Sequence, residues 1–338
     1  MGIILKRHHL YYLLVLFLIQ SCCPHKFIPS SEAPPPPPAF CVPEKIRVAL
    51  VLGSGGVRGL AHVGVIEELK NAGVDFDLII GCSAGSLVGA LYADCPDICH
   101  VQHAVGCMNT DTMLDINIWE ARFGLSQGTS LLRVLDENLD AETFEELQIP
   151  LIVVATDIYS GELVPIGSGD LVKAVRASCS IPLVFVPVEL HGRILVDGGV
   201  INPVPVCLAK ELGADIVIAV DLCELLPTTF PTNLFGIASR STEIAFLWQN
   251  SICVRDADVI IRPKMCGIGT FDDSQREVLL EAGRQAAREA IPKIQRLLCK
   301  LPPKAPCCQG MKLVQLNCYN PVMPAIDTSL EYSIAEAE

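Results

Sequence analysis

The sequence predicts an α/β protein with a mainly parallel central sheet that helices cover on both faces. Short apolar runs rich in valine and isoleucine, such as residues 46–52 and 216–220, alternate along the chain with helix-like segments. In those segments the apolar residues recur every three or four positions. Strands that alternate with helices form parallel sheets, whose strands are apolar throughout because both faces are buried. A hydrophobic fraction of 51% in 338 residues provides a core for one large domain.

The charge balance limits the kinds of partner. A net charge of −13 argues against a long basic groove for nucleic acid, so no nucleic-acid partner is expected. Anionic lipid would repel such a chain, so contact with a membrane has to come from apolar surface or a covalent anchor. With only 19% charged residues beside the apolar fraction, the bulk of the chain is not disordered.

The sixteen cysteines are scattered, and many lie in apolar runs, where they behave as small hydrophobic residues. The nearest approach to a metal-binding pattern is Cys95, Cys99, His100 and His103, which lacks zinc spacing and which we interpret as coincidence. We therefore expect no metal site. Disulfides among the C-terminal cysteines remain an alternative to free thiols: Cys299, Cys307, Cys308 and Cys318.

The N-terminal residues 1–22 predict a signal peptide. Lys6 and Arg7 precede an apolar run at residues 10–19, which is shorter than a membrane-spanning helix. The run ends in Gln20-Ser21-Cys22, which resembles a bacterial lipoprotein box with acylation at Cys22. Gln20 departs from the small residue usual there, so Cys23, a plain secretion signal and an uncleaved anchor remain alternatives.

Residues 23–43 predict a linker, because they include five consecutive prolines at residues 34–38 and show little periodicity. The folded domain is predicted over residues 44–300. Residues 301–338, which contain prolines and cysteines, are predicted to be a tail.

The first strand of the domain, residues 46–52, leads into a glycine loop, Gly53-Ser54-Gly55-Gly56-Val57-Arg58-Gly59, and then into a helix. Such a loop can aim unpaired backbone N–H groups at an anion. A dinucleotide fingerprint would need glycine at the position of Arg58 and an acidic residue at the end of a second strand. An oxyanion hole formed by the amides near Gly55 and Gly56 is favoured, and a simple tight turn is the alternative.

A second glycine-flanked turn, Gly81-Cys82-Ser83-Ala84-Gly85, lies between a strand-like run and a helix-like run. A sharp strand-to-helix turn strains the backbone at Ser83, and Gly81 and Gly85 avoid collisions with the neighbouring backbone. The N-terminus of the following helix favours negative charge near Ser83. The pattern predicts an exposed nucleophilic serine, with an ordinary turn as the alternative.

The remaining segments continue the alternation of strands and helices. Residues 93–147 are irregularly helical, with 129–139 the clearest helix, and this segment either covers the site or admits an acyl chain. The other expected strands are residues 150–157, 162–166, 184–190, 193–196, 216–220 and 259–261. The other expected helices are residues 174–180, 206–212 and 274–298.

A serine nucleophile needs a base, and the usual base is histidine. None of the seven histidines follows a strand end in the manner of a catalytic triad, and His191 lies at the tip of a predicted hairpin. Asp197 does follow a strand end, and Gly198 and Gly199 come after it, which permits close backbone approach. We therefore predict a two-residue site in which Asp197 takes the proton of Ser83. The alternative for Asp197 is a turn carboxylate that caps the next segment.

Three ordered blocks, residues 54–59, 81–85 and 197–199, resemble those of the patatin-like phospholipases. Residues 52–64, 176–182, 196–205 and 211–215 are similar to the bacterial branch related to the catalytic domain of neuropathy target esterase. The resemblance covers about residues 46–298. It implies a three-layer α/β/α patatin-like fold.

The resemblance also implies a serine acyl-ester hydrolase that acts on phospholipids or lysophospholipids in lipid metabolism. Ser83 matches the nucleophile of the family and Asp197 its base. The oxyanion loop is matched by Gly55, Gly56, Val57 and Arg58. Ser54 and Cys82 depart from the usual pattern without removing a catalytic atom, and Cys82 predicts sensitivity to thiol reagents. No cofactor and no calcium site are implied.

Two alternatives to hydrolysis remain at this point. An acyl acceptor other than water would make the protein an acyltransferase, and a protein that kept the fold without turnover would be a lipid-binding envelope lipoprotein. Whichever of these functions holds, the N-terminal pattern predicts an envelope protein held at a bacterial membrane surface through its N-terminus. A dinucleotide-dependent enzyme is opposed by Arg58.

Overall fold

A computed structural model describes residues 35–116, 123–223, 226, 230–265, 267–302 and 310–319. The predicted signal peptide and the lipidation site Cys22 lie outside these residues, as do most of the predicted linker and tail. Cys299 and Cys318 are free thiols, whereas Cys307 and Cys308 also lie outside the described residues.

An eight-stranded sheet forms the centre of the molecule. Its strand order is β6-β7-β4-β3-β2-β8-β9, with β5 paired to β4 beside that path. The pairs β4-β3, β3-β2, β2-β8 and β8-β9 are parallel, whereas β5, β6 and β7 are added in antiparallel pairs. The strands are β2 (Val48–Leu52), β3 (Leu78–Cys82), β4 (Leu151–Asp157), β5 (Leu163–Ile166), β6 (Val188–Leu190), β7 (Arg193–Asp197), β8 (Ile216–Val220) and β9 (Val259–Ile261).

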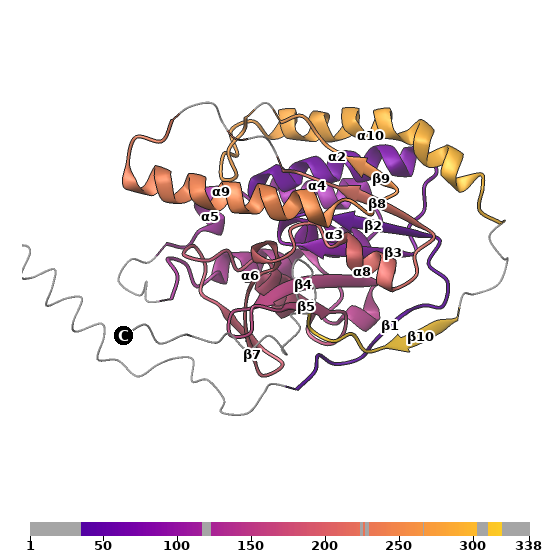
Figure 1. Ribbon diagram of the computed structural model, residues 1–338, viewed down its shortest axis with the longest axis horizontal. Coiled ribbons are helices and arrows are strands. Elements are labelled where there is room, and N and C mark those ends of the chain that lie inside the picture. The colour runs from indigo at the N-terminus through magenta and orange to yellow at the C-terminus, as the bar shows by residue number, and fades with distance from the viewer. Residues whose placement is uncertain are drawn as a thin grey trace, which may run out of the picture.

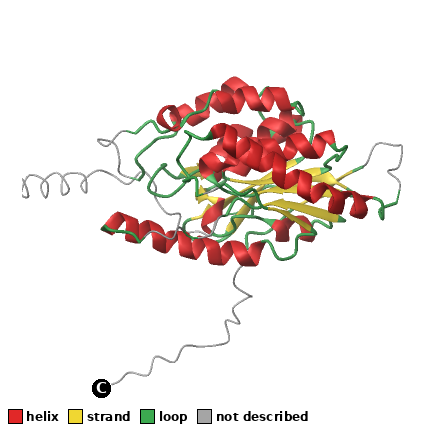
Figure 2. Ribbon diagram, turned by 90° about the horizontal axis from the view of Figure 1, so that it is seen from above, coloured by secondary structure: helices red, strands yellow, loops and turns green. Residues whose placement is uncertain are grey.

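Helices cover the sheet in two further layers (Figures 1 and 2). Leu50 and Leu52 of β2 join one buried cluster with the helices of the first layer, while Ala49 and Val51 join a second cluster on the opposite face. The fold is therefore α/β with a mainly parallel sheet, as the sequence predicts. The first layer contains α2 (Leu60–Asn71), α3 (Ala84–Asp94), α4 (Ile98–Gly106), α6 (Thr129–Asn138), α7 (Leu171–Ser178) and α10 (Arg276–Leu298).

The second face carries fewer helices. It is covered by α8 (Val206–Glu211), by the C-terminal end of α9 (Leu234–Cys253) and by a small ribbon in which β1 (Phe40–Pro43) pairs with β10 (Met311–Val314). The remaining short elements are α5 (Thr110–Met113) and the 3-10 turns η1 (Gly56–Gly59), η3 (Phe144–Glu146) and η4 (Gly198–Val200).

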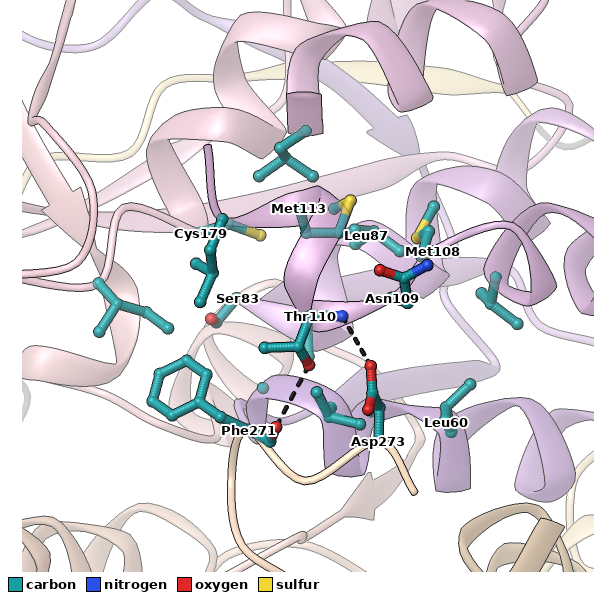
Figure 3. A pocket seen from close by; sticks show the side chains of 18 of the residues that line it. Leu60, Ser83, Leu87, Met108, Asn109, Thr110, Met113, Cys179, Phe271 and Asp273 are labelled. Carbon is teal, nitrogen blue, oxygen red and sulfur yellow. Dashed lines mark hydrogen bonds between the residues drawn. The ribbon is translucent and has the colours of Figure 1, made fainter. Parts of the chain in front are cut away.

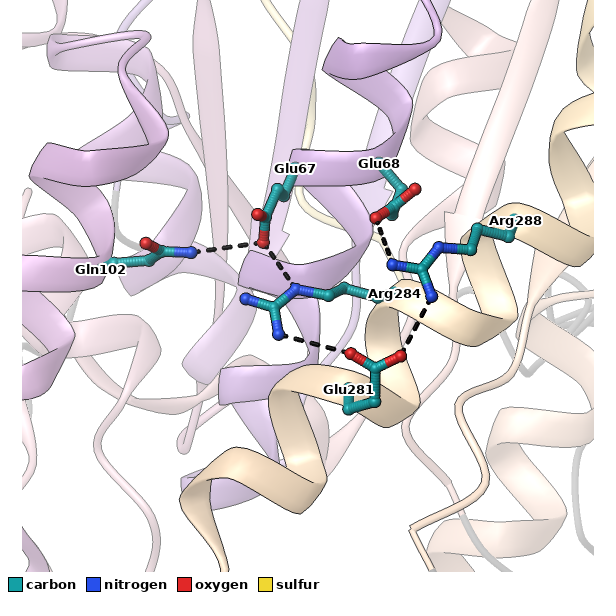
Figure 4. Close-up of polar contacts among 6 residues, drawn as sticks. All are labelled: Glu67, Glu68, Gln102, Glu281, Arg284 and Arg288. Atoms are coloured by element: carbon teal, nitrogen blue, oxygen red, sulfur yellow. Dashed lines mark hydrogen bonds and ion pairs between the residues drawn. The ribbon is translucent and has the colours of Figure 1, made fainter.

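Helices α2 and α10 pack with their backbones almost in contact. A Cβ atom at Gly64 would lie 2.1 Å from the Leu280 carbonyl oxygen, and one at Gly283 would lie 2.1 Å from that of Ala61. Ion pairs flank this contact (Figure 4), with Arg284 bound to Glu67 at 2.8 Å. Arg288 binds Glu68 at 2.8 Å, and both arginines also contact Glu281 of their own helix.

The structure corrects the domain bounds of 44–300 on both sides. Residues 40–43, placed in the linker by their position after the prolines, form β1, and residues 311–314 of the predicted tail form its partner β10. Leu316 is buried in the second core cluster, and Tyr319 pairs with Leu163. The composition of each segment hides this pairing, because the two strands are far apart in the chain.

Candidate active site

Ser83 lies at the junction of β3 and α3 as the N-cap residue of the helix. Its φ of 53° places a residue with a side chain in the left-handed region, which costs free energy and is found at functional turns. Two hydrogen bonds from or to serine side chains help to hold the turn. The Ser83 N–H donates to Ser178 Oγ over 2.9 Å, and Ser86 Oγ donates to the Ser83 carbonyl over 2.6 Å.

The glycines on either side of Ser83 are required by space. A Cβ atom at Gly81 would lie 2.5 Å from the Ser86 Cα, and one at Gly85 would lie 2.1 Å from the Leu52 carbonyl oxygen. Both distances are far inside van der Waals contact with backbone that cannot move independently. The turn can therefore form only where these positions lack side chains.

Asp197 reaches Ser83 because of the way β3 and β7 share one edge of β4. Strand β3 runs parallel to β4 and ends with Cys82 opposite Val154. Strand β7 runs antiparallel to β4 and ends with Asp197 opposite Ala155, while β5 occupies the other edge. The carboxyl ends of β3 and β7 therefore meet head to head at adjacent residues of β4.

The side chains at these two strand ends are hydrogen-bonded. Ser83 Oγ donates to Asp197 Oδ2 over 2.5 Å, although 114 positions separate the residues in the chain. Asp197 Oδ1 accepts from the Gly199 N–H at 2.7 Å. Gly198 allows this close approach, because a Cβ atom there would lie 2.4 Å from the Val154 carbonyl oxygen. The predicted pair is thus in direct contact.

Burial changes the acidity of this pair. Ser83 is 4% exposed and Asp197 is 5% exposed. Desolvation raises the pKa of Asp197 from 3.8 to about 6, against the hydrogen bonds from Ser83 and the Gly199 N–H, which lower it. Asp197 is therefore ionised at neutral pH but is a stronger base than an exposed aspartate.

The glycine loop lies beside the pair and offers backbone donors. Gly53 and Ser54 donate their N–H groups to Val220 and Pro203, and Val57 donates to Thr270 over 2.8 Å. Among the described residues, none accepts from the N–H of Gly55 or Gly56. Of the four predicted oxyanion residues, Gly55 and Gly56 therefore keep free donors, whereas the Val57 N–H is already occupied.

The side chain of Arg58 ties the glycine loop to its surroundings. Its guanidinium donates to Thr270 Oγ1 at 3.1 Å and to the Gly55 carbonyl at 3.4 Å. Gly56 has a φ of 59°, and a Cβ atom there would lie 2.5 Å from the Thr270 carbonyl oxygen. The loop is thus held against the segment around Thr270.

Three residues that support the site were not assigned a role from the sequence. His62 of α2 is fully buried and bonds through Nε2 to the Gly53 carbonyl at 2.7 Å, and burial lowers its pKa to about 4. Ser178 links the Ser83 N–H to the Val154 carbonyl. Ser54 is buried next to Gly199. His62 and Ser178 both lie within blocks that carry the family resemblance, which was the available signal.

Cys82 does not support the predicted sensitivity to thiol reagents. Its side chain is fully buried on the face of β3 opposite the helices of the first layer. Desolvation, with a further contribution from Asp197, raises the pKa of the thiol well above its usual range. A buried, protonated thiol is a poor nucleophile.

An apolar pocket of about 160 Å³ opens at Ser83 (Figure 3). In one wall of the pocket the Thr110 N–H donates to Asp273 and the Thr110 hydroxyl donates to the Phe271 carbonyl (Figure 3). The apolar lining comes mainly from α2, α3, α4, α5 and the segment 179–185: Leu60, Leu87, Val88, Val105, Met108, Met113, Leu114, Leu131, Cys179, Ile181, Phe185 and Phe271. Such a lining suits an acyl chain, so the predicted role of residues 93–147 has a structural basis.

Within the residues that the structure describes, no group of three or more histidine, cysteine, aspartate or glutamate side chains could hold a metal ion. None of the helices in the described ranges is long and apolar enough to cross a membrane.

Comparison with known families agrees with the site and its order along the chain. Residues 50–210 match the family model described as patatin-like phospholipase. The chain carries a patatin-like phospholipase domain. That segment contains the glycine loop, the serine turn and Asp197, the three blocks on which the resemblance depended.

Relatives of the patatin-like domain include members of the bacterial and eukaryotic NTE groups. An uncharacterized NTE family protein of Mycobacterium tuberculosis is 38% identical over 178 residues, which are 52% of this chain and 49% of that protein. Lysophospholipase nte1 of Aspergillus fumigatus is 34% identical over 199 residues, which are 57% of this chain and 13% of that protein. The match therefore spans about half the length of the mycobacterial relative. The predicted NTE-like branch is confirmed.

Among solved structures, VipD from Legionella pneumophila has a similar fold, with a TM-score of 0.51 and 14% sequence identity. The match covers 79% of this chain and 72% of that chain. This likeness supports the three-layer architecture of the patatin-like domain.

Proposed function

We propose that the protein is a serine acyl-ester hydrolase of the phospholipase or lysophospholipase type, with Ser83 as nucleophile and Asp197 as base. One observation carries the proposal: Ser83 Oγ donates to Asp197 Oδ2 at the inner end of an apolar pocket. A hydroxyl becomes nucleophilic when an adjacent base removes its proton. The lysophospholipase name of one relative supports the substrate class.

The chemistry follows from the positions of these atoms. As Ser83 Oγ attacks the ester carbonyl carbon, its proton passes to Asp197 Oδ2, and the carbonyl oxygen becomes an oxyanion. The N–H groups of Gly55 and Gly56, which have no acceptor among the described residues, are the proposed donors to that oxyanion. Asp197 then returns the proton to the leaving alcohol.

The second half of the cycle releases the acid. Water attacks the acyl-Ser83 carbonyl while Asp197 accepts a proton from it, and collapse of the intermediate restores the serine hydroxyl and frees the fatty acid. Because the pKa of Asp197 is about 6, the carboxylate is available for both steps at neutral pH. The pocket holds the acyl chain, so the ester lies over Ser83.

A fluorophosphonate probe tests this proposal directly. The wild-type chain should be labelled and should hydrolyse a soluble short-chain ester, and Ser83→Ala should do neither while keeping its circular dichroism spectrum and melting temperature. Ser251→Ala is a matched control, because Ser251 is an exposed serine of α9 whose Oγ donates to the Trp248 carbonyl of its own helix. A folded wild type that is neither labelled nor active would overturn the hydrolase, and lipid binding unaffected by Ser83→Ala would then favour a lipid-binding protein.

We also propose that the protein is held at a membrane surface through acylated Cys22. The support is the basic start, short apolar run and Ser21-Cys22 at the N-terminus. Cys22→Ala should abolish labelling by radioactive fatty acid and move the protein out of the membrane fraction, whereas Cys23→Ala should do neither. Unchanged labelling of Cys22→Ala contradicts the proposed site.

A further inference from the structure

Three exposed apolar side chains lie together on one side of the pocket. Leu183 is 84% exposed, Ile116 is 55% exposed and Leu125 is 41% exposed. We call these three residues the apolar rim. None of them lines the pocket. Ile116 is two residues from Leu114, and Leu183 is two residues from both Ile181 and Phe185, which do line it. Leu125 is joined to Leu183 by a backbone hydrogen bond.

The rim is a connected surface made of three chain segments. The Leu125 N–H donates to the Leu183 carbonyl at 3.1 Å, and the Ser126 N–H donates to the Val184 carbonyl at 2.8 Å. Ile116 pairs with Ser126, which in turn pairs with Phe185. The backbone ladder therefore fixes the three side chains relative to one another and to the pocket wall at Phe185.

The conformation and exposure of Leu183 cost folding free energy. Its φ of 71° lies in the left-handed region, which a leucine rarely adopts, and its side chain is exposed to water. Both features oppose folding in isolation, and strain of this kind persists where the surrounding structure imposes it and clusters at functional sites. An apolar occupant on Leu183 would offset the exposure.

The charge around the rim identifies the occupant. Residues 123–127 and 180–187 contain no lysine, arginine, aspartate or glutamate. The nearby carboxylate of Asp115 accepts hydrogen bonds from Ser126 Oγ and from the N–H groups of Gly128 and Thr129. With a net charge of −13 on the chain, the described part of this surface suits uncharged hydrocarbon at the boundary of a zwitterionic lipid layer, and a layer of anionic headgroups would be repelled.

We propose that the apolar rim of Ile116, Leu125 and Leu183 docks the protein on zwitterionic lipid, so that an acyl chain passes from the lipid layer into the pocket without crossing water. This inference rests on the proposed function for its substrate. It differs from the N-terminal anchor, because it orients the pocket toward the lipid, whereas an anchor on a linker only holds the protein nearby.

Depth-dependent quenching separates docking of the rim from tethering by the N-terminus. The full chain carrying Ser83→Ala, which prevents turnover, receives one added tryptophan, at Leu183→Trp, or at Leu313→Trp as the matched control. Leu313 is 71% exposed but lies on β10 of the ribbon, far from α5 and α6 (Figure 1). The parent chain gives the background of the native tryptophans.

On vesicles of phosphatidylcholine with brominated acyl chains, we expect the emission added at position 183 to be lost and that added at 313 to be retained. Raising the salt concentration about tenfold should change neither result, because the contact is apolar. Leu125→Trp repeats the test should the 183 variant fail to fold. Equal quenching at 183 and 313, or quenching at neither, overturns the proposal. The proposal is also overturned if the emission of the rim tryptophan shows burial only on self-association of the protein without vesicles. That result would mean that a second copy of the chain covers the rim.

Rates on two substrates separate this proposal from the proposed function. Leu183→Asn tolerates the left-handed backbone and removes the apolar group, so hydrolysis of phosphatidylcholine vesicles should fall about tenfold. Hydrolysis of a soluble short-chain ester should not change, and Leu313→Asn should change neither rate. If the wild type hydrolyses no ester while the tryptophan at position 183 is still quenched, the proposed function is wrong and the docking proposal is supported. If the soluble ester is hydrolysed and Leu183→Asn hydrolyses vesicles as fast as the wild type, only the docking proposal is wrong.

Discussion

The two sides of the pocket are built in different ways. On the inner side, Ser83 and Asp197 are fixed at the ends of the fully buried strand β3 and the largely buried strand β7, and glycines bring backbone within contact distance of both turns. On the outer side, Thr110 of α5 is joined to Asp273 and the Phe271 carbonyl by two hydrogen bonds at 2.7 and 3.2 Å. Phe271 is 44% exposed.

This contrast shows where the domain tolerates change. Ser83 and Asp197 are held by many buried interactions that cannot rearrange separately, whereas the wall around Thr110 depends on a few partly exposed polar contacts. If the proposed function holds, we therefore expect the chemistry to be fixed on the inner side and selection among acyl chains to depend on the outer side. Substitutions on the two sides should have different effects.

The largest effect is expected at the base. Asp197→Asn keeps the shape of the inner side but cannot take the Ser83 proton, so kcat for a soluble ester should fall by about 10³-fold to 10⁴-fold. In the wild type the rate should rise with pH through about 6 as Asp197 ionises, and the residual rate of the variant should lack this step. Stopped-time assays across pH measure both. Retention of more than about a tenth of the rate would show that another group is the base.

Gly85→Ala tests how rigid the inner side is. The added Cβ atom meets the Leu52 carbonyl at 2.1 Å, so unfolding free energy should fall by about 1–3 kcal/mol or more, and labelling of Ser83 should be lost. The control is Gly106→Ala at the end of α4, where a Cβ atom has no neighbour within 4 Å and stability should be kept. Equal melting curves for the two variants would mean that the turn can move.

The buried carboxylate also predicts how stability depends on pH. The pKa of Asp197 is about 6 in the folded protein and near 3.8 when unfolded, so the folded state holds this proton more tightly. Ionisation therefore destabilises the fold as pH rises from about 4 to 6, by at most about 3 kcal/mol. Asp197→Asn lacks this cost and should be more stable than wild type at pH 8 but not at pH 4. Denaturant unfolding at both pH values measures the difference, and a gap of the same size at each would contradict the raised pKa.

The smallest effect is expected on the outer side. Thr110→Val removes the hydroxyl that donates to the Phe271 carbonyl and keeps the hydrogen bond from the backbone N–H to Asp273. The loss of one hydrogen bond should weaken the attachment of α5 to the segment around Phe271 by about 0.5–1.5 kcal/mol. The kcat for the shortest ester should be unchanged, while KM for long-chain esters should change. A loss of kcat on every chain length would show that the wall also positions the reacting atoms.

The sequence predicted the inner side better than the rest of the molecule. Gly81, Gly85, Ser83, Asp197 and Gly198 are required by local geometry, and local geometry leaves a pattern of residue types at fixed spacing. The occupation of the Val57 N–H by Thr270 could not be predicted, because more than two hundred residues separate the partners.

The outer side and the edges of the fold left weaker patterns. The pocket wall combines α4, α5 and the segment near Phe271, which no single stretch of sequence reveals. Helix α9 was not predicted, because its apolar residues are largely exposed and do not follow a buried stripe: Ile237, Ile244 and Trp248. The ribbon of β1 and β10 was divided between a predicted linker and a predicted tail, since pairing of distant strands has no local signal.

The backbone contact between α2 and α10 has a consequence for synthesis of the protein. Helix α2 follows directly on the glycine loop, but it can pack against α10 only after Gly283 has been synthesised and has reached Ala61. Until α10 emerges from the ribosome, the nascent chain would leave an apolar face of α2 open to solvent. Closure across so long a stretch of polypeptide is slow, so the ribosome-bound intermediate should depend on chaperones until the last helix arrives.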